Sequence, residues 1–250
     1  AREKNNLDIL FKNSLVVTEF KDSPLFNIAK KNNCTLLEHK KDIGGRYSIF
    51  SNVGMIPAIL ADLDVKKIHL GASKVFERND FLDTFKFAQI FKFCNSNKYL
   101  SNVVMTYSDG LNYFGKWYMQ LWAESIGKKD RGITAMHAIG TTDQHSQLQL
   151  YLDGPKDKFF TFLSSENSRD NKKISTVIRA QCLATKNILK KNKIPLRHFV
   201  FNKNDESELG TVFTYFILET ILLAKLMKVN AFDQPAVESI KAETQKILRS

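Results

Sequence analysis

A stretch near the N-terminus decides the fold class, and it reads Ser14-Leu-Val-Val-Thr-Glu-Phe-Lys-Asp-Ser-Pro-Leu-Phe-Asn-Ile-Ala-Lys-Lys-Asn-Asn-Cys-Thr-Leu-Leu-Glu-His39. The β-branched run at its start and the run Thr35-Leu-Leu-Glu-His39 at its end are typical of strands. Between them, Ser23 suits a helix N-cap and Pro24 suits the first helical position, which predicts a helix over Leu25–Lys31. Strand, helix and strand within about 25 residues predict a βαβ unit of a parallel sheet.

Outward from this unit, similar patterns continue to the C-terminus. Two helices are predicted first, over Val53–Ala61 and Asp80–Cys94. The later predicted elements are, in chain order, a strand over Asn102–Thr106, helices over Tyr113–Ser125 and Thr142–Leu152, a strand over Lys158–Leu163, a helix over Thr176–Lys190, a strand over Leu196–Phe201 and helices over Leu209–Met227 and Ala236–Leu248. This alternation predicts an α/β protein with one partial unit and one fuller unit, joined by helices.

The composition is that of an ordinary folded protein. Of the 250 residues, 43% are hydrophobic and 25% are charged, which excludes a disordered chain and a collagen-like fibre. Lys and Arg number 37 against 26 Asp and Glu, so the formal net charge is +11. This excess suits nucleic acid, an anionic membrane or an anionic small molecule, and it equally suits a lysine-rich surface that keeps a protein soluble. Composition therefore leaves the partner open.

Cysteine usage and hydropathy bear on the location of the protein. The three cysteines lie far apart without a CxxC pair, so we expect no disulfides, no zinc ribbon and a reduced, cytoplasmic compartment. The most apolar stretch, Val212–Met227, is interrupted by Glu219 and Lys225. The longest charge-free run in this region, Leu209–Leu218, has only half of the roughly 20 residues needed to cross a bilayer. We therefore predict a buried helix there and no membrane partner.

The first segment that could carry chemistry is Asp42-Ile-Gly-Gly-Arg-Tyr-Ser-Ile-Phe-Ser51. Its two glycines, Gly44 and Gly45, allow a tight turn and a close approach of the backbone to a ligand. Arg46 then places a cation where a strand ends, at the usual ligand-binding edge of an open α/β sheet. A plain turn with a surface arginine fits the same residues.

The second segment is Lys116-Trp-Tyr-Met-Gln-Leu-Trp-Ala-Glu-Ser-Ile-Gly-Lys128. Gln120 and Glu124 are four residues apart and therefore share one face of the predicted helix. Apolar surroundings raise the pKa of a carboxyl group toward the range that a general base needs. The alternative is an ordinary surface glutamate near the end of a helix that Gly127 stops.

The third segment is Ile139-Gly-Thr-Thr-Asp-Gln-His-Ser-Gln-Leu-Gln-Leu150. Thr141 and Gln144 have the spacing of a capping box, so we expect the helix to begin there with His145 in its first turn. The positive end of a helix favours a neutral imidazole that can transfer a proton. A single histidine, however, more often makes structural hydrogen bonds only.

The fourth segment is Asn230-Ala-Phe-Asp-Gln-Pro-Ala-Val-Glu-Ser-Ile-Lys241. Pro235 suits the first turn of the last helix. Gln234 and Lys241 are seven residues apart, which places them on the same side of that helix and two turns apart. Any single lysine of this chain is most often solvated.

Several motifs of common enzyme classes are absent from the sequence. It contains no Walker loop, no GxGxxG after a strand, no HExxH and no GxSxG, and its five histidines lack metal-ligand spacing. We therefore expect no metal, nucleotide or dinucleotide cofactor. Basic runs such as Lys190-Lys191 lack the interleaved aromatic residues of a single-strand binder, so we expect no nucleic-acid partner.

The four segments, taken together and in this order, resemble the glucose-6-phosphate isomerase family. Residues 42–54 look like the first signature of the family, and residues 232–241 look like its C-terminal signature. Between them, Gly115–Lys128 and Gly140–Leu150 match in content and order. Four long motifs in the correct order over residues 42–241 make the resemblance specific.

The resemblance implies sugar-isomerase (SIS) domains, each a three-layer αβα sandwich around a parallel sheet. On this basis, we expect residues 1–70 to be the C-terminal part of a first SIS domain and residues 71–100 to be a helical connector. Residues 101–228 would form the second SIS domain, and residues 229–250 a C-terminal helix with the lysine signature. The Ser/Thr-rich phosphate-binding loop of the family lies well before the Gly-Gly-Arg motif, so we expect the chain to be a C-terminal fragment that is inactive alone.

The resemblance also implies an activity, the reversible conversion of glucose 6-phosphate to fructose 6-phosphate in glycolysis and gluconeogenesis, without metal or organic cofactor. Carried over by motif, Glu124 is the base that moves a proton between C2 and C1 through a cis-enediol(ate), and Arg46 stabilises its negative charge. His145, supplied by the neighbouring subunit of a homodimer, assists ring opening with Lys241 beside it. The implied substrate-binding residues are Gln120, Gln234 and Gly45.

Two alternatives remain open at this point. The chain could be a non-catalytic SIS module that only binds phosphosugars, although a binder needs no base. It could also be an isomerase for another sugar phosphate, which would keep Glu124 and differ in specificity.

Overall fold

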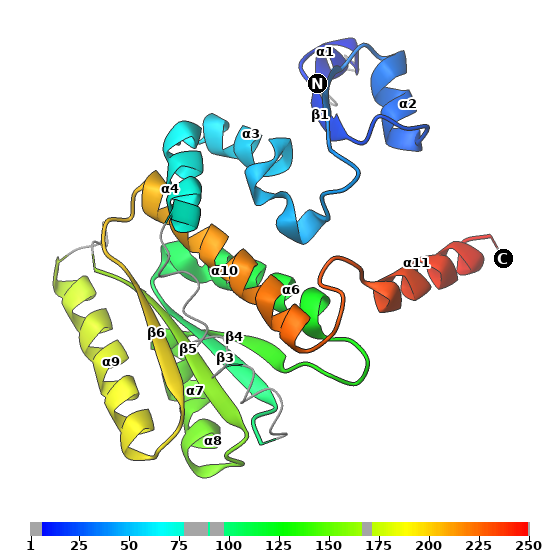
Figure 1. Cartoon of the computed structure of the whole chain (residues 1–250). Coiled ribbons are helices and arrows are strands. Elements are labelled where there is room, and N and C mark those ends of the chain that lie inside the picture. The colour runs from blue at the N-terminus through cyan, green and yellow to red at the C-terminus, as the bar shows by residue number, and fades with distance from the viewer. Residues whose placement is uncertain (1–6, 78–89, 91–97, 167–171, 250) are drawn as a thin grey trace. The chain divides into compact units, whose positions relative to one another are not determined.

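The computed structural model describes residues 7–77, 90, 98–166 and 172–249, drawn as ribbons in Figure 1. They fall into two compact units, unit 1 (Ala1–His69) and unit 2 (Leu70–Ser250). The helix predicted over Asp80–Cys94 lies outside the described residues apart from Ile90. The finer division into a connector and a separate C-terminal helix stays a prediction.

Unit 1 contains the predicted βαβ unit. Strands β1 (Leu15–Thr18) and β2 (Thr35–Glu38) pair in parallel, with helix α2 (Pro24–Lys31) between them in sequence. The N-cap of α2 is Ser23, whose hydroxyl oxygen accepts a hydrogen bond of 3.3 Å from the backbone N–H of Phe26. The unit also has a short helix that was not predicted, α1 (Leu7–Lys12).

The remainder of unit 1 is helical. A 3₁₀ helix, η2 (Gly45–Phe50), leads into α3 (Asn52–Leu60), and α4 (Val65–Glu77) runs across the division between the units. Helix α4 was not predicted. The Asp64 carboxylate accepts hydrogen bonds from the first free backbone N–H groups of α4, which is the usual chemistry of an N-cap.

Unit 2 is built on a parallel sheet of strands β3 (Ser101–Tyr107), β4 (Thr134–Ile139), β5 (Lys158–Ser165) and β6 (Leu196–Phe201). Their order in the sheet is β4-β3-β5-β6, and every pair is parallel. Almost every residue of the two central strands, β3 and β5, is buried, as expected for strands that are covered on both faces. The predicted α/β class is confirmed.

Helices cover both faces of this sheet (Figure 1). One face carries α6 (Asn112–Ile126), which follows the short 3₁₀ helix η4 (Asp109–Leu111), and α10 (Glu206–Leu226). The other face carries α7 (Gly140–Ser146), α8 (Leu148–Asp153) and α9 (Lys172–Lys191), whose buried residues pack with alternate residues of β3 and β5. The chain ends in α11 (Pro235–Ile247). This is the three-layer αβα sandwich that was predicted.

Helix α10 was predicted as a buried helix. Among the described helices it is the one whose length and apolar composition would allow a membrane crossing. Its Phe216, Leu223 and Ala224 are fully buried in unit 2, and Glu219 forms an ion pair with Arg197 of β6. A charged residue paired inside the fold is typical of a core helix, which agrees with the prediction.

The region around residue 140 differs from the prediction in two ways. Strand β4 was not predicted, because Thr-Ala-Met-His-Ala-Ile lacks the β-branched run of a strand. The helix predicted over Thr142–Leu152 is two helices, α7 and α8, which meet at Gln147. Helix α7 begins directly after β4, two residues earlier than expected, where a Cβ at Gly140 would lie only 2.7 Å from the ring of Tyr107.

The predicted capping box of α7 does not form. The N-cap is Ile139 rather than Thr141, and the backbone N–H of Ile139 donates to the Asp143 carboxylate at 2.6 Å. The side-chain oxygen of Gln144 instead accepts hydrogen bonds from Tyr107 and Thr185, because α7 lies against β3 and α9. As a consequence, His145 lies in the last turn of a short helix and not in its first turn.

Candidate active site

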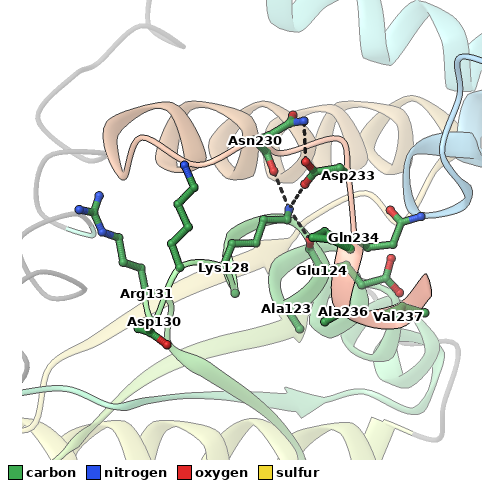
Figure 2. Close-up of a pocket in the computed structure, with 13 residues that line it drawn as sticks. Ala123, Glu124, Lys128, Asp130, Arg131, Asn230, Asp233, Gln234, Ala236 and Val237 are labelled. Atoms are coloured by element: carbon green, nitrogen blue, oxygen red, sulfur yellow. Dashed lines mark hydrogen bonds and ion pairs between the residues drawn. The ribbon is translucent and has the colours of Figure 1, made fainter. Parts of the chain in front are cut away.

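A pocket of about 810 Å³ in unit 2 contains two of the predicted site residues (Figure 2). One wall is the end of α6 with the turn that follows it, and the other is the segment between α10 and α11. Glu124 belongs to the first wall and Gln234 to the second. The complete lining consists of Ala123, Glu124, Gly127, Lys128, Lys129, Asp130, Arg131, Asn230, Asp233, Gln234, Pro235, Ala236 and Val237.

Helix α6 holds the Glu124 carboxylate at this pocket, and other residues of the same helix end are buried in the core. Leu121, Trp122 and Ile126 are fully buried, and the indole N–H of Trp122 donates to the backbone oxygen of Ile133 at 2.9 Å. Glu124 is partly exposed, and its Oε1 accepts a hydrogen bond of 3.0 Å from Nε2 of Gln120, one turn earlier. The shared helix face that was predicted for Gln120 and Glu124 is confirmed. The base candidate thus has a fixed orientation and an open side.

The turn after α6 is unusually tight. Lys128 and Arg131 exchange two backbone hydrogen bonds of 3.1 and 3.0 Å. The two residues between them, Lys129 and Asp130, have positive φ values of 54° and 56°, which is the pattern of a type I′ turn. This conformation favours Gly, Asn and Asp, so Asp130 suits it, whereas Lys129 adopts it at a cost of about 1 kcal/mol. The turn has Lys128 at its first position and Arg131 at its last.

The second wall is ordered by a small polar network. The side chain of Asn230 donates to the carboxylate of Asp233 at 2.9 Å and accepts from the backbone N–H of Phe232 at 3.0 Å. Gln234 follows as the N-cap residue of α11, with Pro235 at the first helical position as predicted. The network therefore ends one residue before the predicted substrate-binding amide.

Lys241 does not line the pocket. It lies on α11, where every residue after Pro235 is exposed, and its ammonium pairs with Oε1 of Glu238 at 2.8 Å. The hydrogen bond and the charge of Lys241 lower the pKa of the Glu238 carboxyl. Seven residues separate Lys241 from Gln234, or about 10 Å along the helix axis. Within unit 2, Lys241 is thus a solvated lysine near the site.

His145 lies near the C-terminal ends of the strands, whereas Glu124 lies near their N-terminal ends. The turn after α6 leads into the start of β4, whereas α7 begins directly after the end of β4. The six residues of β4 span roughly 20 Å. His145 is exposed there, with its Nε2 3.2 Å from the side-chain nitrogen of Gln144. Unit 2 therefore does not bring Glu124 and His145 together.

The remaining predicted residues belong to unit 1. The predicted turn is present, since the backbone N–H of Tyr47 donates to the oxygen of Gly44 at 2.9 Å. A Cβ at Gly45 would meet no atom within 4 Å, so the backbone is open on that side. Arg46 is only 2% exposed, and its guanidinium carbon lies 5.1 Å from the centre of the Tyr47 ring. The alternative of a surface arginine is therefore wrong.

The structure adds residues that the sequence analysis did not assign to the site. Lys128, Asn230 and Asp233 connect the two walls of the pocket (Figure 2). All three stand at or near the ends of the second and fourth segments, and that position was the available signal. Among the described residues, no group of three or more His, Cys, Asp or Glu side chains is placed to hold a metal ion.

Comparison with known proteins bears on the identity of the chain. No family model matches it. A protein of Methanococcus maripaludis named "Probable glucose-6-phosphate isomerase" is 37% identical over 254 residues, which cover 94% of this chain. The glucose-6-phosphate isomerase of Methanocaldococcus jannaschii is 32% identical over 88% of the chain. The chain is homologous to part of glucose-6-phosphate isomerase.

The homology to glucose-6-phosphate isomerase confirms the resemblance that the four segments indicated. The chain spans less than two thirds of the length of these curated relatives, 57% of the first and 60% of the second.

Solved structures agree on the fold. A hypothetical protein of Thermus thermophilus matches 99% of the chain with a TM-score of 0.84 at 26% identity, over 66% of its own length. A glucose-6-phosphate isomerase of Chlamydia trachomatis matches 96% of the chain with a TM-score of 0.76. At 19% identity, this second likeness concerns the fold alone.

Proposed function

We propose that the protein interconverts glucose 6-phosphate and fructose 6-phosphate, with Glu124 as the base. The observation that carries this proposal is the pocket in which Glu124, oriented by Gln120, faces the segment of Gln234. A carboxylate beside an open cavity of about 810 Å³ has room for a sugar phosphate within reach. The homology to glucose-6-phosphate isomerases supports the choice of substrate.

In this mechanism, the Glu124 carboxylate removes the proton from C2 of the open-chain aldose. The electron pair of that C–H bond forms the C1–C2 double bond, and the carbonyl electrons move to O1. A proton then passes from the C2 hydroxyl to O1, and protonated Glu124 returns its proton to C1. C2 becomes the carbonyl carbon of the ketose, so no oxidant or reductant is needed. One positioned base contributes about 10²–10⁴ in rate.

The negative charge of the enediolate needs a partner, and we assign that role to Arg46, with Gly45 leaving the backbone open to the substrate. Buried cations stabilise such charge better than solvated ones, and Arg46 is buried. Gln120 and Gln234 would hold the sugar hydroxyls.

Ring opening requires a proton at the ring oxygen, and we assign this step to His145 of the partner subunit, with Lys241 nearby. His145 lies at the opposite end of the strands from Glu124, which supports its use in the site of a second copy. The enzyme would therefore work as a homodimer, and we place it in the cytoplasm.

The test is a coupled assay for glucose 6-phosphate formed from fructose 6-phosphate, using the full natural chain. We expect Glu124→Gln to lower kcat by about 10²–10⁴, because the amide cannot accept the proton. Glu243→Gln is the matched control, since Glu243 is exposed and forms a surface ion pair with Lys246. It should stay within about twofold of wild type.

Three outcomes would contradict the proposal. If Glu124→Gln keeps the wild-type kcat, Glu124 is not the base. If the wild-type chain binds sugar phosphates without turnover, the non-catalytic module is correct. Faster turnover of another phosphorylated aldose would favour the alternative isomerase.

A further inference from the structure

Lys128 is a nearly buried lysine at the junction of the two pocket walls. Its side chain is 10% exposed, although lysine side chains are seldom buried without partners. Its Nζ lies 2.7 Å from the backbone oxygen of Glu124 and 2.9 Å from that of Ser125, both in α6. It also lies 2.5 Å from the backbone oxygen of Asn230, which is 102 residues away in sequence, and 3.3 Å from Oδ1 of Asp233. Figure 2 shows the contacts with Glu124, Asn230 and Asp233 converging on one ammonium group.

The contacts on the α6 side are those of a helix C-cap. The last four carbonyl groups of an α-helix lack partners within the helix, and a cation near them is favoured by the helix dipole. Lys128 serves the carbonyl groups of Glu124 and Ser125, which are two of these four. One of them belongs to the proposed base itself. The ammonium therefore fixes the backbone from which the Glu124 side chain projects.

The contacts on the other side hold the segment before α11. The backbone oxygen of Asn230 accepts the third hydrogen bond of the ammonium, and the carboxylate of Asp233 provides the countercharge. The Asn230 side chain is in turn bonded to the Asp233 carboxylate at 2.9 Å. These two residues bracket a short loop that leads directly to Gln234. Lys128 thus fixes the residue next to the proposed substrate-binding amide.

An ammonium group has three N–H donors, and the three backbone oxygens match that number. The geometry is that of a connecting group and not of one that serves a substrate. The type I′ turn that begins at Lys128 supports the same function. Arg131, at the other end of the turn, donates to the backbone oxygen of Met227 at the end of α10 and provides a second connection.

We propose that Lys128 is a positioning residue that sets the spacing between Glu124 and Gln234. It joins the end of α6 to the segment between α10 and α11, so that base and substrate-binding amide stay on opposite sides of one substrate. This assignment rests on the proposed function, because the spacing matters only if both residues act on the same sugar.

The test uses Lys128→Met in the full natural chain, which keeps the stem of the side chain and removes the ammonium. Two measurements are made, the kinetic constants for fructose 6-phosphate and the hydrogen exchange of the backbone amides of residues 228–237. A misplacement of about 1 Å can cost up to about 100-fold in rate, so we expect kcat to fall about 10- to 100-fold. KM should rise several-fold as well, because Gln234 moves together with the released segment. Exchange in residues 228–237 should become faster.

Lys225→Met is the matched control. Lys225 is exposed in the last turn of α10 and lies close in sequence to the same segment. Its loss removes one positive charge without touching the junction, so we expect neither kinetic constant nor exchange to change beyond about twofold. Asp233→Asn is a milder second variant in case Lys128→Met does not fold. It removes the countercharge and keeps an acceptor for Asn230, and we expect a rise in KM of about two- to fivefold.

The outcomes separate this proposal from the proposed function. If the wild-type chain does not turn over fructose 6-phosphate, the proposed function fails, and the exchange data still test the connection. If exchange in residues 228–237 and both kinetic constants stay at wild-type values in Lys128→Met, the positioning role is wrong. A lower kcat with an unchanged KM that recovers on cooling would show a loss of stability only, and it too would overturn the proposal.

Discussion

Arg197 and His198 are neighbours on β6, yet their side chains lie on opposite faces of the sheet of unit 2. Arg197 points to the face of α6 and α10, where it donates to Tyr118 at 2.7 Å and to Thr161 at 2.9 Å and pairs with Glu219. His198 points to the face of α9, between Ser164 and Lys186. One face therefore contains a buried ion pair, and the other contains an imidazole bonded to a hydroxyl and to an ammonium group.

The face with the ion pair supports the proposed base. Glu219 is fully buried, and desolvation raises the pKa of its carboxyl group while the charge of Arg197 opposes that rise. The hydroxyl of Tyr118 connects this pair to α6, six residues before Glu124. The ion pair holds the middle of α6 against the sheet, and Lys128 holds its end. Polar groups on this face thus serve to fix one helix.

The opposite face, which we call the neutral face after its uncharged imidazole, also contains the ammonium group of Lys186. His198 accepts at Nδ1 from the ammonium of Lys186 at 2.8 Å, so Nε2 carries the hydrogen and donates to Ser164 at 2.8 Å. Burial, together with the charges of Lys186 and Lys190, lowers the pKa of His198 to about 4. A histidine that donates to a serine cannot act as a base toward it. The pair therefore stabilises the fold and does not form a nucleophile.

The difference suggests that the two faces serve different sites. Glu124 lies on a helix of the ion-paired face, and His145 lies on the exposed end of the neutral one. The first test of this difference uses two inactive variants, Glu124→Gln and His145→Gln. They are mixed, unfolded and refolded together. A hybrid dimer has one site with both residues intact, so random mixing should restore about one quarter of wild-type activity.

Each variant alone should lose about 10²-fold or more, which makes this the largest expected effect. Refolding each variant with itself is the control, and exchange of subunits is checked with a tag on one variant. If tagged hybrids form and remain inactive, His145 of one chain does not serve the site of the other, and the two faces belong to one site.

The second prediction concerns the buried ion pair. Arg197→Met leaves the Glu219 carboxyl group in the core without its partner, and we expect the free energy of unfolding to fall by about 3–5 kcal/mol. Arg197→Met with Glu219→Met removes both charges, and it should return to within about 1–2 kcal/mol of wild type. Urea unfolding measures both. Equal losses in the single and the double variant would show that packing, and not charge, is at stake.

Much of this architecture could be predicted from the sequence because it depends on local patterns. The cap at Ser23, the strand Leu196–Phe201 and the pairing of Gln120 with Glu124 follow from spacing within one element. Strand β4 could not be predicted in this way. Among the described strands it pairs only with β3, and it is half-buried, so its identity comes from its neighbour and not from its residues.

The candidate site shows the same division. The four segments named Glu124 and Gln234, but spacing could not show that Lys128 joins them. That connection links residues 102 positions apart, and a contact of this kind exists only after the chain has folded. The environment of His198 was equally hidden, because Ser164, Lys186 and His198 come from three different elements.

The last prediction tests the neutral face by pH. The pKa of His198 is about 4 in the folded chain and near 6.5 when unfolded, so the unfolded state binds more protons between these values. The contribution to stability is complete above pH 6.5 and is lost as the pH falls toward 4, on the order of 2 kcal/mol. His198→Gln keeps an acceptor for Lys186 and a donor for Ser164 without a titrating ring, and should show a shallower loss.

Urea unfolding from pH 7 to 4.5 measures this difference between wild type and variant. His137, whose pKa is also lowered by burial, contributes in the same direction and is common to both chains. Lys190→Met should lie between them, because it removes one of the charges that lower the pKa of His198. If the free energy of unfolding has the same slope against pH in all three chains, His198 titrates in the folded chain as it does in the unfolded chain. Below pH 6.5, both neighbours on β6 would then carry a positive charge.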